Sequence, residues 1–333
     1  MEDAATTTPT ARLGWIGLGS MGIGMAVNLQ KHLSASRNTN LHYYNRTMAR
    51  GEPLKAIGGV PCVHVGDLVS RSDVIFLSLS DDAALSSTLD AIIEAAKASS
   101  GLSGKLIVDT STVHPTSSTR AQARLAQEGV KMVAAPVFGA SPVAAQGKLL
   151  FILAGPDEAV QAISPYLVGV MGRGVIRLGE DVSQSSMLKT AGNFMTAAMM
   201  EVVAEAHVFA EKTGVGSEAM ESLIEQQYGP LALSMSKRLT TGAYMPAKDE
   251  RPWSDLNLAL KDVGHGIGCA KDAGARLPVG ELALAHLQEA KAFSDEKGRA
   301  MDSSSMYGVL RRQAGLDFET DLVKQRDEAK RPG

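Results

Sequence analysis

The sequence is poor in the features that mark secreted, membrane-spanning and nucleic-acid-binding proteins. Cys62 and Cys269 are the only cysteines among 333 residues, which indicates a reducing compartment and argues against a disulfide framework. The net charge is only −3, so no basic field would draw the chain to nucleic acid or to an anionic membrane surface. No apolar run reaches the roughly 18 residues that a membrane-spanning helix needs.

The chain also lacks the marks of a leader and of a metal centre. Residues 1–10, MEDAATTTPT, are polar, without the apolar core of a signal peptide or an arginine-rich amphipathic pattern. We expect them to form a disordered tail on a cytoplasmic protein. Neither cysteine has the neighbours of a metal-binding motif, so we expect each to be a small core residue and no metal to be bound.

The pattern of expected secondary structure changes along the chain. Up to about residue 180 short apolar segments alternate with helical ones, which predicts an α/β fold with a doubly wound parallel sheet. Beyond residue 183 strand signals fade, which predicts a long interdomain helix over 183–213 and then further helices, with turns at Gly229-Pro230, Gly242 and Pro278. We therefore predict an α/β domain over 11–181 and an all-α domain over 182–333. The expected strands are 12–16, 41–44, 60–63, 74–79, 106–108, 131–134, 150–153 and 175–178.

An apolar strand leads directly into a glycine-rich turn near the start of the chain. Gly17, Gly19 and Gly22 form the pattern GxGxxG between this strand and an apolar helix. The first glycine permits the tight turn, the second lets a pyrophosphate approach the backbone, and the third allows close packing of helix on strand. Free N–H groups and the positive dipole end of the helix favour phosphates. This order predicts a dinucleotide-binding Rossmann domain; a purely structural turn is the alternative.

The end of the second expected strand indicates which dinucleotide is bound. NAD enzymes usually carry an acidic residue there, which accepts a hydrogen bond from the ribose 2′-OH. Here neutral Asn45 is followed by Arg46 and Thr47. A guanidinium can pair with a 2′-phosphate that a carboxylate would repel, and Arg50 offers a second charge. We therefore expect NADP(H), with a merely solvated arginine at position 46 as the alternative.

Ligands of an open α/β sheet lie beyond the carboxyl ends of its strands. Three loops are expected at that edge: residues 77–81, residues 109–115 and residues 135–142. The second, rich in hydroxyl groups and running into a proline, offers donors to a substrate carboxylate or simply caps a helix. His114 in that loop could polarise a substrate, but an exposed histidine without a catalytic role is the more ordinary interpretation.

A lysine and an asparagine share one face of the expected long helix. Lys189 and Asn193 are four residues apart among apolar neighbours. A desolvated ammonium can donate the proton that a carbonyl oxygen needs during hydride transfer, with Asn193 holding the oxygen or the lysine. The alternative is a lysine whose stem covers apolar surface while its head reaches water.

Together these segments resemble the β-hydroxyacid dehydrogenase family, which includes 3-hydroxyisobutyrate dehydrogenase and the glyoxylate and succinic semialdehyde reductases. The resemblance covers nearly the whole chain. It implies a 6-phosphogluconate dehydrogenase-type Rossmann domain, a helical second domain that also dimerises, and the NADP-using branch. The motifs that carry it are GLGSMGIGMAVNL (17–29), DTSTVHP (109–115), APVFGASPVAAQGKL (135–149), KTAGN (189–193) and LALKDVGHGIGCAKDAGARLP (258–278).

By motif position the resemblance implies roles for individual residues. Lys189 matches the catalytic lysine and Asn193 its partner. The implied or expected substrate contacts are Ser111, Thr112, Gly139 and Ala140. The implied or expected cofactor contacts are Gly17, Leu18, Gly19, Ser20, Met21, Gly22, Asn45, Arg46, Thr47, Leu79, Ser80, Thr112 and Lys261.

The substrate loop departs from the family pattern. Where the family usually reads Ser-Gly-Gly, this chain has Phe138-Gly139-Ala140, so a hydroxyl is lost and bulk is gained. The related imine reductases and reductive aminases typically replace the lysine with Asp or Tyr, and Lys189 argues against that branch. These departures concern the substrate rather than the cofactor.

The sequence therefore predicts an NADP(H)-dependent oxidoreductase that interconverts a small β-hydroxyacid, or a related alcohol, with its aldehyde or ketone. Lys189 is the expected general acid and base, the expected partner is a small molecule, and the protein is expected to be a homo-oligomer, most simply a dimer. One alternative is reduction of imines or bulkier carbonyls in the same cleft. Another is a non-catalytic NADP-binding module that uses the helical domain as an interaction surface.

Overall fold

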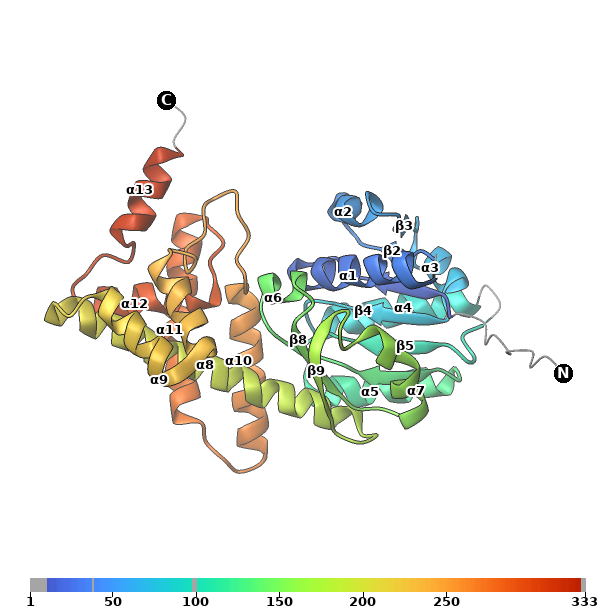
Figure 1. The fold of residues 1–333 in the computed structure, drawn as a ribbon. Coiled ribbons are helices and arrows are strands. Elements are labelled where there is room, and N and C mark those ends of the chain that lie inside the picture. The colour runs from blue at the N-terminus through green and yellow to red at the C-terminus, as the bar shows by residue number, and fades with distance from the viewer. Residues whose placement is uncertain (1–10, 38, 98–100, 331–333) are drawn as a thin grey trace. The chain divides into compact units, whose positions relative to one another are not determined.

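The computed structural model describes residues 11–37, 39–97 and 101–330, and the expected tail, residues 1–10, lies outside them. The chain divides into two compact units, residues 1–189 and 190–333. The division falls inside α8 (Val182–Thr213), the long helix expected at residues 183–213 (Figure 1). The predicted domain boundary after residue 181 is the start of this same helix.

The first unit is built on a six-stranded sheet with the order β3-β2-β1-β4-β5-β6. Every neighbouring pair in it is parallel. This is the strand order of a doubly wound Rossmann sheet, so the predicted fold class is confirmed. The strands are β1 Leu13–Ile16, β2 His42–Tyr44, β3 Val60–Pro61, β4 Val74–Leu77, β5 Leu106–Asp109 and β6 Lys131–Ala134.

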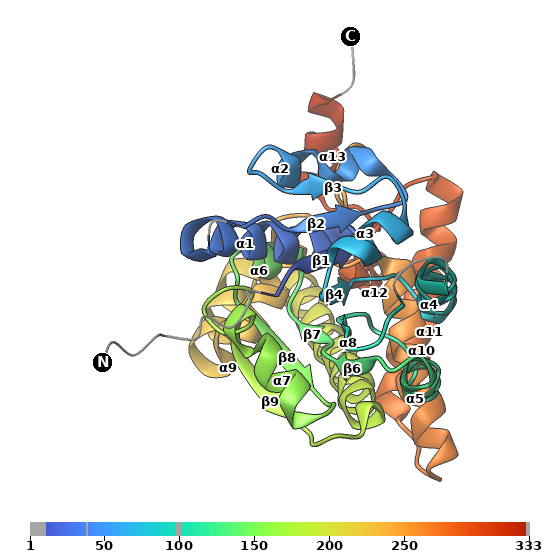
Figure 2. The same ribbon diagram turned by 90° about the vertical axis from the view of Figure 1, so that its right-hand side faces the viewer.

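Alternate residues of these strands enter two cores, because helices cover both faces of the sheet. Trp15 and Phe76 are cross-strand neighbours whose rings stack at 5.4 Å in the core under α1. Ile75 and Leu77 belong to the other core, which α3, α4 and α5 close. Figure 2 shows α1 and α4 on opposite sides of the sheet. The helices before α8 are α1 Ser20–Arg37, α2 Glu52–Lys55, α3 Val65–Arg71, α4 Asp82–Lys97, α5 Pro115–Gln127, α6 Ser141–Ala145 and α7 Asp157–Ile163.

Two expected strands do not join this sheet, which corrects the prediction of a single sheet. β8 (Leu149–Leu153) pairs in parallel with β9 (Gly172–Arg177) and antiparallel with β7 (Val137–Phe138), so the three form a second sheet. Only residues 135–136 separate β6 from β7, whereas a further parallel strand requires a crossover of about a dozen residues. The segment 135–142, expected to be a loop, therefore contains β7 and the start of α6.

The second unit is helical, and no strand follows β9 within the described residues. The predicted turns are confirmed: Gly229, with φ of 78°, kinks α9 before Pro230, Gly242 has φ of 75° in the turn after α9, and Pro278 begins α11. None of the described helices combines the length and apolar character that crossing a bilayer requires. After α8 follow α9 Ser217–Thr240, α10 Leu256–Asp272, α11 Pro278–Lys297, α12 Met306–Gln313 and α13 Asp321–Ala329.

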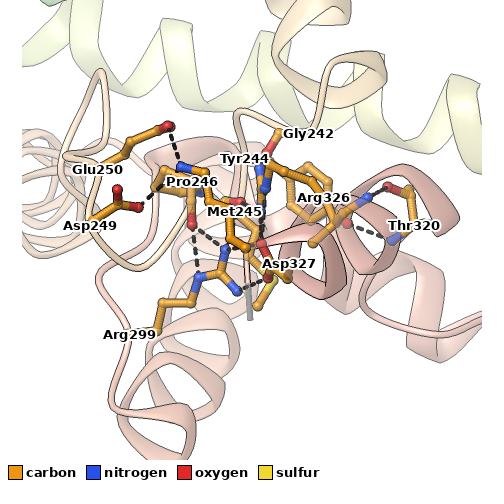
Figure 3. Close-up of polar contacts among 12 residues, drawn as sticks. Gly242, Tyr244, Met245, Pro246, Asp249, Glu250, Arg299, Thr320, Arg326 and Asp327 are labelled. Atoms are coloured by element: carbon orange, nitrogen blue, oxygen red, sulfur yellow. Dashed lines mark hydrogen bonds and ion pairs between the residues drawn. The ribbon is translucent and has the colours of Figure 1, made fainter. Parts of the chain in front are cut away.

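A polar cluster fastens the last helix to the second unit (Figure 3). The buried guanidinium of Arg299 donates to the Pro246 carbonyl oxygen at 2.8 Å and pairs with Asp327 of α13. The Tyr244 hydroxyl accepts from the Thr320 N–H at 2.9 Å, just before that helix begins. Buried polar groups need such partners, and here they make the C-terminal segment part of the helical unit.

Candidate functional site

The three glycines of the turn between β1 and α1 differ in whether the surrounding structure requires a glycine. Gly17 has φ of +99°, and a Cβ there would lie 2.2 Å from the Ser78 carbonyl oxygen. A Cβ on Gly22 would lie 2.2 Å from the Gly17 carbonyl oxygen, so α1 approaches the strand end only without a side chain. Around Gly19, by contrast, no other part of the described chain lies within 4 Å of the place a Cβ would take. Packing does not require a glycine at position 19, and the open space over its backbone fits a pyrophosphate.

Hydrogen bonds hold this turn at the carboxyl edge of the sheet. The Gly17 N–H donates to the Tyr44 carbonyl oxygen at 3.1 Å, which ties the turn to the end of β2. The Trp15 indole N–H donates to the Gly17 carbonyl oxygen at 2.9 Å. Helix α1 begins at Ser20 with no acidic residue in its first turn, and Met21 follows at its start. A helix N-terminus without a competing carboxylate favours an anion.

Asn45 fastens the glycine turn to the segment that carries the predicted NADP contacts. Its Oδ1 accepts from the Leu18 N–H at 2.8 Å, and its Nδ2 donates to the Thr47 carbonyl oxygen at 2.8 Å. An ionised aspartate could make the first bond but not the second, because it has no donor. Arg46 and Thr47 are exposed, and among the described residues no hydrogen bond or ion pair engages the Arg46 guanidinium.

The loops after β4 and β5 are joined to each other. Ser111 Oγ accepts from the Leu79 N–H at 2.8 Å, and the Ser111 N–H donates to Asp109 Oδ1 at 3.0 Å. Ser111 is buried and Thr112 half-buried. Ser80, the residue after Leu79, donates its hydroxyl to Asp81. The structure thus brings the predicted substrate contact Ser111 and the predicted ribose contact Leu79 to one edge of the sheet.

The segment after β7 carries the predicted contacts Gly139 and Ala140. Gly139 has φ of +132°, and a Cβ there would lie 2.7 Å from Leu149 and 3.0 Å from Val143. Only glycine fits both the backbone conformation and the space. Gly139 is exposed, and Ala140 is the residue before α6, so the backbone at this turn is accessible to a ligand.

Lys189 is buried, with 7% of its surface exposed. Its Nζ lies 4.2 Å from the centroid of the Phe138 ring, which is a cation–π distance. Phe138 belongs to β7 and Lys189 to the first turns of α8, so the first unit alone brings the substrate segment and the lysine together. The interpretation in which the lysine head simply projects into water does not fit this burial.

In the second unit Asn193 and Lys261 meet at a residue that the sequence analysis did not single out. Asn193 Nδ2 donates to Asp262 Oδ2 at 2.7 Å, and Lys261 Nζ forms an ion pair with Asp262 Oδ1 at 3.1 Å. Because the amide nitrogen faces the carboxylate, the amide oxygen of Asn193 is turned away from it. The only signal in the sequence was a carboxylate next to a lysine, which is ordinarily a solvated pair of little consequence.

Two further side chains that the sequence analysis considered have structural contacts. His114 caps α5, since its Nδ1 accepts from the Thr116 N–H at 3.3 Å. Burial raises the pKa of the Cys62 thiol to about 11, so this cysteine stays protonated near neutral pH. Within the described ranges no group of three or more His, Cys, Asp or Glu side chains is placed to hold a metal ion.

Comparison with known proteins identifies the family. Residues 12–179 match the NAD binding domain of 6-phosphogluconate dehydrogenase, and residues 183–310 match the NAD-binding region of NADP-dependent 3-hydroxyisobutyrate dehydrogenase. The chain belongs to the 3-hydroxyisobutyrate dehydrogenase family. The predicted family is therefore confirmed, as is a nicotinamide dinucleotide as the cofactor of an oxidoreductase.

Relatives in this family span almost the whole chain. An NADH-dependent oxidoreductase of Aspergillus ustus is 33% identical over 305 residues, which are 90% of this chain and 99% of that protein. The mitochondrial 3-hydroxyisobutyrate dehydrogenase of Drosophila melanogaster is 25% identical over 304 residues, or 90% of each chain. A solved 3-hydroxyisobutyrate dehydrogenase of Mycobacterium tuberculosis, with L-serine, has the same fold with a TM-score of 0.72 at 22% identity, covering 91% of this chain and 99% of that one. The family descriptions name both NADH and NADP, so the choice rests on this chain's own residues.

Replacing Asp262 by alanine should lower kcat without unfolding the protein. Asn193 and Lys261 are both predicted site residues. The substitution frees the Asn193 amide to rotate and removes the ion-pair partner of Lys261, and a small misplacement at a reactive site costs up to about 100-fold. We expect kcat to fall by about 10- to 100-fold in steady-state assays with a nicotinamide cofactor. Asp262→Asn keeps an acceptor for Asn193 and should retain more activity. The exposed Asp272→Ala on the same helix is the matched control, and wild-type kcat in Asp262→Ala would show that the contact is only structural.

Proposed function

We propose that the protein is an NADP(H)-dependent oxidoreductase that interconverts a small β-hydroxyacid, or a related alcohol, with its aldehyde or ketone, with Lys189 as general acid and base. The observation that carries the proposal is the burial of the Lys189 ammonium against the substrate segment, in the unit that also carries the glycine turn.

Reduction of the carbonyl group requires a hydride at its carbon and a proton at its oxygen. A dihydronicotinamide, held by the glycine turn between β1 and α1, would supply the hydride for the carbonyl carbon. Lys189 supplies a proton from Nζ to the carbonyl oxygen as the C=O bond becomes an alcohol, and in oxidation it takes that proton back. Phe138 shields one side of the ammonium from water, which strengthens its interaction with the developing alkoxide.

The remaining predicted contacts take positioning roles in this proposal. The Ser111 hydroxyl accepts a hydrogen bond from the Leu79 N–H, which leaves its proton for a substrate carboxylate. The backbone at Gly139 and Ala140 is proposed to offer a second contact for the same group, and Thr112 a further one. Asn193, oriented by Asp262, would hold the reacting oxygen. Lys261, Leu79 and Ser80 are proposed as cofactor contacts.

Lys189→Ala should remove most of the turnover while leaving cofactor binding nearly intact. A positioned general acid contributes about 10²–10⁴-fold, so we expect kcat to fall by that factor. NADPH oxidation over a panel of small aldehydes and ketones measures kcat, and fluorescence titration measures the NADPH dissociation constant. Lys131→Ala is the matched control, because this exposed lysine is the first residue of β6 and so lies at the amino-terminal end of the strands, away from the carboxyl edge. Near-normal turnover in Lys189→Ala would remove the proposed role.

The proposal of NADP(H) rests on the geometry around Asn45. Both ends of its amide are used to fix the backbone at Leu18 and Thr47, so no acidic group points to where a ribose 2′-substituent would lie. Arg46, the residue after Asn45, is exposed. Its guanidinium is available to pair with a 2′-phosphate through two parallel hydrogen bonds. The NADH dependence in the name of the Aspergillus relative is a property of that protein. Titration of this protein with NADPH and NADH separates the two cofactors.

Arg46→Ala should weaken NADPH binding much more than NADH binding. A charge-assisted hydrogen bond to a phosphate is worth about 1.5–3 kcal/mol, or roughly 10- to 150-fold in the dissociation constant. Calorimetric titration of both cofactors into wild type and variant measures this difference. The exposed Arg173→Ala on β9 is the control. A wild-type protein that already prefers NADH would refute the cofactor proposal before any variant is made.

We also propose that the protein is a homodimer through its helical unit. Four exposed apolar side chains of α8 are spaced by four, three and seven residues, which places them on one face of the helix. Helix α9 also carries exposed apolar side chains. Exposed apolar surface of this kind marks an interface, and a two-fold axis lets one patch meet its own copy. The residues are Met195, Met199, Val202 and Phe209 of α8 and Leu223, Tyr228 and Leu231 of α9.

A charge in this patch should dissociate the dimer. Light scattering of wild type at micromolar concentration should give twice the 35.0 kDa chain mass, and Val202→Glu should give the monomer, because a buried unpaired charge opposes association. Leu322→Glu, an exposed apolar position on α13 outside the patch, should leave the mass unchanged. A monomeric wild type would contradict the proposal.

A further inference from the structure

Phe138 is held rigidly on a strand. It pairs with Leu150 across the antiparallel ladder of β7 and β8, which fixes the register of the segment. Successive side chains of a strand point to opposite faces: Val137 is buried in the core of the first unit, whereas Phe138 is only half-buried. The ring is therefore directed out of the core by the strand itself, toward the side on which Lys189 lies.

The contact with Lys189 places this ring beside the proposed reacting centre. The ammonium nitrogen lies 4.2 Å from the ring centroid, so the face of the ring covers one side of the proton donor. An atom that receives a proton from Lys189 must come within hydrogen-bond distance of the same nitrogen. Groups attached to that reacting carbon consequently fall within reach of the Phe138 ring edge.

The Phe138 side chain itself offers no hydrogen bond to a substituent that lies against it. A phenyl group can neither donate to a carboxylate nor accept from a hydroxyl. The space beside Gly139 is filled by the aliphatic side chains of Leu149 and Val143, which would lie 2.7 and 3.0 Å from a Cβ there. A polar substituent packed against these side chains would lose its water without gaining a partner from them, and an apolar one would be favoured.

We propose that Phe138 is a specificity-determining residue that selects carbonyl substrates with an aryl or branched alkyl group on the reacting carbon. The inference rests on the role of Lys189 in the proposed function. A small or hydroxylated substituent leaves the ring edge uncovered, whereas an aryl group packs against that edge and displaces water from around the ammonium.

The test compares two aldehydes that carry the same charge. We would measure kcat/KM with NADPH for 4-carboxybenzaldehyde and for succinic semialdehyde, in wild type, Phe138→Ser and Phe138→Leu. Wild type should prefer the aromatic aldehyde, and Phe138→Ser should shift the ratio toward succinic semialdehyde by about 10- to 100-fold, the range that apolar pocket contacts supply. Phe138→Leu keeps an apolar side chain and should retain most of the preference. Val168→Ser, an exposed apolar position of the same unit, should leave the ratio unchanged.

A binding measurement separates this inference from the proposed function. Calorimetry with terephthalate and succinate, two dianions that cannot be reduced by hydride transfer, reports the same aryl preference without turnover. A wild type that shows no turnover but binds terephthalate more tightly than succinate, with this preference lost in Phe138→Ser, would refute the proposed function and support the specificity role. A wild type that prefers the aliphatic member of each pair, or a Phe138→Ser variant with unchanged ratios, would overturn the specificity role.

Discussion

The close approach of α1 to the end of β1 is the constraint on which the nucleotide edge depends. The Gly22 backbone comes so near to the Gly17 carbonyl oxygen that a Cβ would lie 2.2 Å from it. That approach places the α1 N-terminus and the open backbone of Gly19 at the carboxyl edge of the sheet. The loops after β2, β4 and β5 leave the sheet at the same edge. The contacts of Asn45 with Leu18 and of Ser111 with Leu79 therefore lie beside the glycine turn.

Two side chains fix the position of neighbouring residues through hydrogen bonds and an ion pair. Asn45 uses its whole amide to hold the glycine turn and the Arg46 segment in one arrangement, and Asp262 uses its carboxylate to orient Asn193 and pair with Lys261. In both cases a short polar group fixes a neighbour that is proposed to meet the ligand. Preorganisation of this kind lets the neighbour act without a cost of reorientation at the moment of reaction.

The predicted substrate segment is where this chain departs from the pattern that the family resemblance implies. The family pattern places a hydroxyl where Phe138 stands, and the structure puts that ring over the ammonium of Lys189. The change leaves the dinucleotide edge untouched, because Phe138 belongs to the second, three-stranded sheet. One chain can therefore keep the cofactor chemistry of its family while its substrate range differs.

Local patterns were enough to predict the six parallel strands, the glycine turn, the long helix α8 and the kink at Gly229, because periodicity and glycine conformation are properties of short segments. They did not predict the second sheet, since the pairing of β7 with β8 depends on where the chain goes after Pro136. They also did not predict the contact of Asp262 with Asn193, which joins residues 69 positions apart, nor the ring of Phe138 over Lys189. Contacts of this kind arise only when separate elements pack together, and no local sequence signal specifies which side chains will then meet.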